Sequence, residues 1–179
     1  MKEIFDFKGY LSRPFVFCIL VAAIIIFPVL IIGASQGASV PFEQANQTYT
    51  EIIQEASTIT WFDIFANNFI ISIITLVPFF GVYRMGLVQY NTGFSLGSVA
   101  KAGGIDPLYV LSYVITSPVG MLEYASYVLI TAESLVLIYS AYKRQAKERL
   151  VKHAWKTVLF VALFLLLGAI IEAVMLGRL

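Results

Sequence analysis

The sequence predicts an all-α fold: a polytopic transmembrane helical bundle of about four spans, with a re-entrant or broken helix at Ser117–Gly120. Of its 179 residues, 59% are hydrophobic and only 13% are charged, whereas about a quarter of the residues of a soluble domain are charged. The mean hydropathy is +0.84. Several apolar runs reach the roughly 20 residues that a spanning helix needs. We therefore expect residues 1–179 to form a single integral membrane domain.

The N-terminal part combines a short basic segment with the first span. Residues 1–13 are short, amphipathic and basic, with Ile4, Phe5 and Phe7 beside Lys2, Lys8 and Arg13, which predicts an interfacial helix on the cytoplasmic face. The following apolar run, 14–33, is longer than the core of a signal peptide and is expected to be retained as the first span. An Ala-x-Ser-like sequence follows it, so cleavage stays open.

Residues 34–63 form an acidic connection without lysine or arginine. Because basic residues mark the cytoplasmic side, this loop is expected to be extracytoplasmic. Apolar residues recur at helical spacing from Pro41 onward, which predicts an amphipathic helix. It would lie on the outer membrane surface, cap the bundle or dock a partner.

The second span is expected at 64–89, and a segment rich in small residues follows at 90–106. The span is interrupted by Pro78 and Gly81, and Arg84 near its inner end is expected to snorkel towards lipid headgroups. The segment 90–106 would let another helix approach closely. It is expected to be a short embedded helix or a tightly packed cytoplasmic loop.

The second half of the chain should contain a half-helix and two further spans. Residues 107–117 are too few to cross a bilayer, since eleven helical residues rise about 16 Å. The third span is expected at 121–142 and the fourth at 154–176. Five basic residues in 143–153 place that loop in the cytoplasm.

These loop positions predict the topology of the whole chain. With the loop after the second span also inside, residues 107–117 would be a re-entrant half-helix that breaks at Pro118 and Gly120. The N-terminus would be cytoplasmic and the C-terminus extracytoplasmic.

This topology brings polar residues from three segments to one depth. Asn67 and Asn68, Glu123 and Glu172 should meet in the outer third of the membrane, because unpaired polar groups are costly there. Glu133 lies about 15 Å deeper on the same helix as Glu123. It could pair with Arg84 or lie protonated between helices. The cluster is best explained as a hydrogen-bonded structural knot. A path for a proton, ion or polar solute, and hydrolysis by carboxylates, are the alternatives.

Composition limits the chemistry that the chain can support. One cysteine, Cys18, excludes an internal disulfide, and one histidine, His153, leaves no histidine-rich metal site. No nucleophile motif accompanies the carboxylates. We therefore expect no enzymatic activity, no metal and no cofactor, and a net charge of +1 gives no reason to expect nucleic-acid binding.

Four motifs resemble those of the stage II sporulation protein M family, in its archaeal-type form. They are Asn68 in the second span, Asn91-Thr92-Gly93 with Leu96-Gly97, the run from Pro118 to Ala125 with Glu123 inside it, and Glu172 in the last span. The sequence departs from the family pattern at Val119, where the family has histidine. The resemblance implies a polytopic, non-enzymatic scaffold whose hydrolytic work is done by partner proteins.

The leading functional hypothesis is therefore a non-enzymatic membrane scaffold or anchor. Its expected partners are the lipid bilayer, other membrane proteins and further copies of itself, in membrane or cell-envelope organisation. The alternative is a small oligomeric transporter or channel subunit that uses the Glu/Asn cluster, because broken helices often build transport sites.

Overall fold

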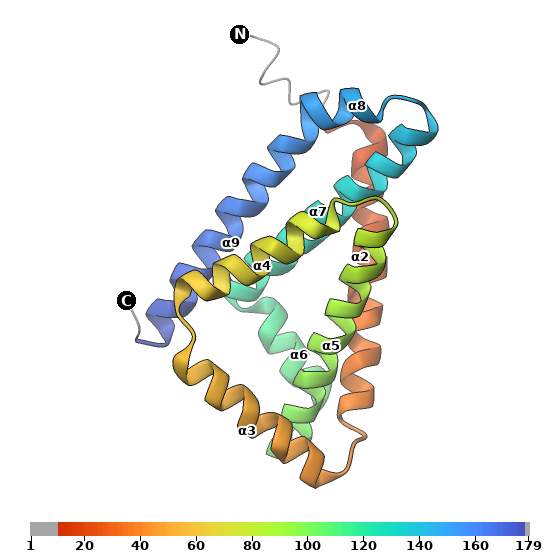
Figure 1. Cartoon of the computed structure of the whole chain (residues 1–179). Helices are drawn as coiled ribbons and strands as arrows, with labels where there is room; N and C mark the ends of the chain where they lie inside the picture. The colour runs from red at the N-terminus through yellow and green to blue at the C-terminus, as the bar shows by residue number, and fades with distance from the viewer. Residues whose placement is uncertain (1–10, 178–179) are drawn as a thin grey trace.

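The computed structural model describes residues 11–177, and every regular element in this range is helical (Figure 1). The all-α class expected from the sequence is thereby confirmed. The interfacial helix expected at 1–13 falls almost entirely outside the described residues.

Four long helices and several shorter ones make up the fold. The long helices are α2 (Arg13–Gly37), α5 (Phe80–Gly103), α7 (Pro118–Tyr142) and α9 (Trp155–Met175). The shorter ones are α3 (Phe42–Thr58), α4 (Trp61–Thr75), α6 (Pro107–Thr116) and α8 (Ala146–Arg149), with a π-helical turn, η1 (Leu150–Ala154), leading into α9.

Three described segments are long and apolar enough to cross a membrane: Arg13–Gly37, Pro118–Tyr142 and Ala146–Met175. A fourth is added if α3 and α4, whose directions differ by a bend of 115°, are counted as one broken span. We call the end of the molecule that carries α8 and residues 143–153 the basic end. The opposite end, where α3 lies across the other helices, is the α3 end (Figure 1).

Helices α2 and α5 pack closely through two pairs of glycines. A Cβ atom on Gly33 would lie 2.2 Å from the Tyr90 carbonyl oxygen, and one on Gly97 would lie 2.0 Å from the Ala34 carbonyl oxygen. Gly37 and Gly93 are equally confined. Small residues spaced four apart on both helices allow such backbone contact. Residue numbers increase together along the two helices, so they run parallel.

This parallel packing corrects the topology expected from the sequence. Residues 90–103 continue α5, and Gly97 lies beside Ala34 at the α3 end. The connection 104–106, which begins with Gly104 at φ 63°, therefore lies at the opposite end from the basic loop. The expectation that both loops lie on one side was wrong, because α5 has no long apolar run to reveal its direction.

The reversal that makes this possible lies between α4 and α5. The expected single span 64–89 is divided at residues 76–79, where Phe79 has a φ of 63° and the Phe80 N–H donates to the Pro78 carbonyl oxygen at 2.7 Å. This is a γ-turn of the strained type. Gly81 then lets α5 approach α4, since a Cβ there would lie 2.1 Å from the Thr75 carbonyl oxygen. Helices α4 and α5 thus form an antiparallel hairpin.

The second break lies at Ser117, between α6 and α7. The Ser117 hydroxyl accepts from the Gly120 N–H at 3.0 Å and donates to the Val114 carbonyl oxygen at 2.8 Å, which ends one helix and caps the next. Helix α6 begins at the α3 end and leads to the start of α7 (Figure 1). Residues 107–117 are therefore the first part of a broken passage towards the basic end, and not a half-helix entering from that end.

Helix α7 is the most buried of the long helices and forms the centre of the core. It packs antiparallel to α2 and to α9, with Tyr124 and Tyr127 joining Ile26 and Leu165 in one apolar cluster. A second cluster, around Phe15, Ala22, Ala132 and Val136, lies nearer the basic end. The two clusters follow one another along α7 and pack it against its neighbours over most of its length.

Candidate functional site

A small polar cavity lies near the α3 end, where α4, α7 and α9 meet. Asn68, Glu123 and Glu172, each from a different helix, line it together with Val119. Its volume is about 10 Å³, roughly the space that one water molecule requires. The structure thus brings together three of the four residues expected to form the polar cluster.

Glu123 is held within this cavity by its own helix. The Tyr127 hydroxyl, one turn further along α7, donates to Glu123 Oε1 at 2.8 Å. The Ser117 cap fixes the first turn of α7. Pro118 suits the first helical position, because the backbone N–H that proline lacks would have no partner within the helix there. A Cβ on Gly120 would lie 1.9 Å from the Val114 carbonyl oxygen, so only glycine permits this close approach. The break therefore aims Glu123 at α4 and α9.

Asn67 faces a different place from Asn68. Its Nδ2 donates to Asn68 Oδ1 at 3.3 Å, but its side chain lines an open groove of about 410 Å³ between α4 and α5. Asn91, Thr92 and Ser95 of α5 line the same groove. Asn91 is thus brought to Asn67, and neither lines the cavity that holds Glu123.

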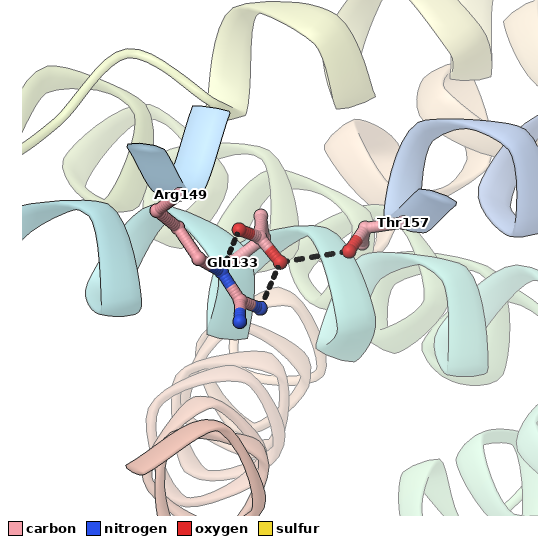
Figure 2. A network of polar contacts seen from close by, with 3 residues as sticks. All are labelled: Glu133, Arg149 and Thr157. Carbon is pink, nitrogen blue, oxygen red and sulfur yellow. Dashed lines mark hydrogen bonds and ion pairs between the residues drawn. The ribbon is translucent and has the colours of Figure 1, made fainter. Parts of the chain in front are cut away.

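Glu133 belongs to a second, fully buried network near the basic end (Figure 2). Arg149 donates from Nε to Glu133 Oε1 and from Nη2 to Oε2, each at 2.7 Å, and the Thr157 hydroxyl donates to Oε2 at 2.7 Å. Glu133 is 0% exposed and Arg149 7% exposed. The guanidinium also lies over the Phe15 ring at 5.0 Å. This two-pronged contact ties α8 to α7, α9 and α2.

The expected alternatives for Glu133 were therefore wrong about its partner. Arg84 does not pair with it, and the partner is Arg149 from the basic loop. Arg84 lies on α5, half-buried, and its Nε is buried without a hydrogen-bond partner among residues 11–177. The two carboxylates of α7 thus belong to separate clusters, Glu123 near the α3 end and Glu133 near the basic end.

The side chains that line the α3-end cavity determine what it can bind. Two carboxylates and one amide around a space for one water can share a proton, hold a water or hold a small cation. Within residues 11–177, no group of three or more histidine, cysteine, aspartate or glutamate side chains is placed to hold a metal ion. The cavity by itself therefore specifies no reaction.

Sequence reasoning missed the buried network because Arg149 looked like one of several topology-setting charges. Its neighbours Lys147 and Lys152 are exposed, whereas Arg149 turns inward immediately before the π-helical turn. A usable signal was the lone Glu133 in an apolar part of α7, since a buried carboxylate that stays charged needs a cationic partner. Gly33 and Gly37 were also missed, since they lie at the end of an apolar run that already had an explanation.

Comparison with known proteins gives one family match. The family model described as stage II sporulation protein M matches residues 15–175. No curated protein and no solved structure shows a significant match to the chain. The match extends from the first turn of α2 to the end of α9 and includes Glu123, Glu133 and Glu172. The chain therefore belongs to the stage II sporulation protein M family of membrane proteins.

Proposed function

We propose that the chain is a non-enzymatic scaffold of the membrane, which anchors partner proteins. The observation that carries this proposal is the exposed apolar face of α3. This helix has 17 residues, yet Ala45 is its one buried residue. Phe42 and Ile53, on one face of α3, are 59% and 52% exposed. An apolar helix face left open in this way is typical of an interaction surface.

The contacts between the helices suit a rigid bundle that holds α3 in place. The glycine contacts between α2 and α5, and the Glu133–Arg149–Thr157 network, fix helices against one another at both ends. A rigid body of this kind can present α3 in one orientation. Such preorganisation reduces the entropy that a partner loses on binding.

The distribution of basic residues supports an orientation for this scaffold. Four of the five basic residues in 143–153 are exposed: Lys143, Arg144, Lys147 and Lys152. We infer that the basic end is cytoplasmic, together with the N-terminus, by the positive-inside rule. The α3 end and the C-terminus are then extracytoplasmic, so α3 would dock partners of the cell envelope.

Purification from native membranes tests the proposal. Tagged chain is isolated in mild detergent and its co-purifying proteins are quantified by mass spectrometry, alongside a variant carrying Phe42→Gln and Ile53→Gln. We expect partners in fixed ratio with the wild-type chain and their loss from the variant. The matched control changes Gln47 and Glu51, on the opposite face of α3, to alanine and should keep the partners. Partners unaffected by either variant would overturn the role of α3.

A second candidate function is a small oligomeric transporter or channel subunit. The observation that favours it is the cavity of Asn68, Glu123 and Glu172, since ionisable groups at membrane depth often mark proton or ion paths. Reconstituted chain would then conduct protons or cations across liposomes. Glu123→Gln would abolish that flux, whereas Glu148→Gln, an exposed change at the basic end, would leave it intact.

A further inference from the structure

Arg84 is a cationic side chain without an anionic partner in the described structure. It makes no side-chain hydrogen bond or ion pair within residues 11–177, and its Nε is buried. The ion pairs described there are Glu133–Arg149 and Glu148–Lys152. A guanidinium carries five N–H donors and keeps all of them, because it is not deprotonated in proteins.

The depth of Arg84 makes this unusual. Gly93 lies against Leu30 and Ala34 of the parallel helix α2, so nine residues earlier Arg84 lies level with residues 21–25. Met85 shares a core cluster with Ile26, in agreement with this level. The apolar run of α2 extends from residue 14 to residue 32, which puts Arg84 near its middle. About 13 Å of helix separates this level from Pro14, further than the side chain reaches by snorkelling.

Arg84 lies at one end of a helical face of α5 that also carries two uncharged polar residues. Arg84, Val88, Asn91 and Ser95 are spaced by four, three and four residues, so they share one helical face. Val88, Asn91 and Ser95 line the open groove that Asn67 of α4 also lines. The side chains of Asn91 and Ser95 make no hydrogen bonds within the part of the chain described. The open groove thus presents unused amide and hydroxyl groups, and Arg84 lies one helical turn before Val88 on the same face of α5.

We propose that this face of α5 docks a transmembrane helix of another protein that carries an aspartate or glutamate opposite Arg84. A carboxylate satisfies the guanidinium with two parallel hydrogen bonds. Asn67, Asn91 and Ser95 then hydrogen-bond polar groups further along the same partner helix. The proposal rests on the scaffold function and names the chemistry of one partner. A second copy of this chain fits poorly, since a two-fold axis along the membrane normal would oppose Arg84 to Arg84.

Model peptides in liposomes test this docking. The full chain, carrying a donor fluorophore, is reconstituted with acceptor-labelled leucine–alanine helices that have glutamate, glutamine or leucine at the midpoint. Energy transfer is measured against the peptide-to-lipid ratio at pH 7.5. We expect the glutamate peptide to bind about tenfold more tightly than the glutamine peptide, the size of a polar helix contact in membranes. Arg84→Gln should remove this preference.

Two variants keep the test independent of folding. Arg84→Lys retains the charge but loses the two parallel hydrogen bonds, so it should keep part of the preference. Lys147→Gln removes an exposed charge of α8 and should keep all of it. Equal binding of the three peptides, or a preference that survives Arg84→Gln, would overturn the proposal. Energy transfer between two labelled copies that Arg84→Gln abolishes would assign the face to self-association instead. Either result leaves the α3 pull-down unaffected, so failure of the scaffold role is read separately.

Discussion

Removing one partner of the Glu133–Arg149–Thr157 network should destabilise the bundle strongly. Glu133 is completely buried and accepts three hydrogen bonds of 2.7 Å, two from Arg149 and one from Thr157. Glu133→Gln keeps the shape of the side chain and removes its charge. The guanidinium of Arg149, which is 7% exposed, would then be buried without a counter-charge.

The size of the effect follows from the burial of both groups. Breaking a buried ion pair on one side costs about 3–5 kcal/mol, because the other charge stays desolvated. We expect Glu133→Gln to lower the free energy of unfolding by about 3 kcal/mol, the low end, since glutamine can still accept from Thr157. Replacing both Glu133 and Arg149 by leucine should cost only about 1 kcal/mol, mainly for the stranded Thr157 hydroxyl.

A double-mutant cycle in mixed micelles of mild detergent and SDS measures these differences. The reporter is Cys18, half-buried in α2 beside the Phe15 cluster, whose thiol reacts with a maleimide dye on unfolding. Lys152→Gln is the matched control, since the Glu148–Lys152 pair is exposed to solvent and should contribute little to the free energy of unfolding. A double variant as unstable as the sum of its singles would refute the network as a coupled unit.

Three further predictions address packing, topology and helix capping. Gly97→Ala should lower the free energy of unfolding by about 2 kcal/mol, because the added Cβ would clash with the backbone of α2. Gly86→Ala on the same helix meets no atom within 4 Å and should be neutral or stabilising. Equal effects of the two changes would contradict the α2–α5 contact. In a cysteine-free background, Ile105→Cys should react with an impermeant maleimide from outside the cell and Lys147→Cys only after permeabilisation; labelling of both from one side would contradict the parallel arrangement of α2 and α5. Thr60→Ala removes the capping box of α4 and should cost about 1 kcal/mol in thermal unfolding; an unchanged free energy would show that the cap does not stabilise α4.

The positions of the helix breaks were largely predictable from residue chemistry. Proline and glycine interrupt apolar runs at Pro78 and Pro118, and the structure ends one helix and begins another at each place. A proline cannot donate a backbone hydrogen bond, so its effect on a helix is local and readable from sequence. The amphipathic spacing of 42–58 likewise gave α3 as a separate helix.

The directions of the helices were not predictable in the same way. Helix α5 contains Arg84, Gln89 and Asn91, and its weak hydropathy hid the fact that it runs back along α2. The parallel packing depends on backbone contact at Gly33, Gly37, Gly93 and Gly97, a pairing that arises only in three dimensions. A single unrecognised reversal at 76–79 was enough to misplace the loop 104–106.

The expected membrane depth of each residue predicted most, but not all, of the polar cluster at the α3 end. Asn68, Glu123 and Glu172 were expected together because each lies at a similar distance from a predicted membrane boundary, and they line one cavity. Asn67, adjacent in sequence, turns about 100° around α4 and faces α5 instead. Depth alone therefore selects a level of the bundle, while helical phase decides which side chains meet.

Proton and cation flux in proteoliposomes tests most directly whether the polar residues serve structure and docking or transport. The chain is reconstituted with a pH-sensitive or cation-sensitive dye inside, and the rate is compared with that of empty liposomes and of Glu123→Gln. The scaffold account predicts no flux above empty liposomes for either protein. Flux through the wild-type chain that Glu123→Gln abolishes would contradict it.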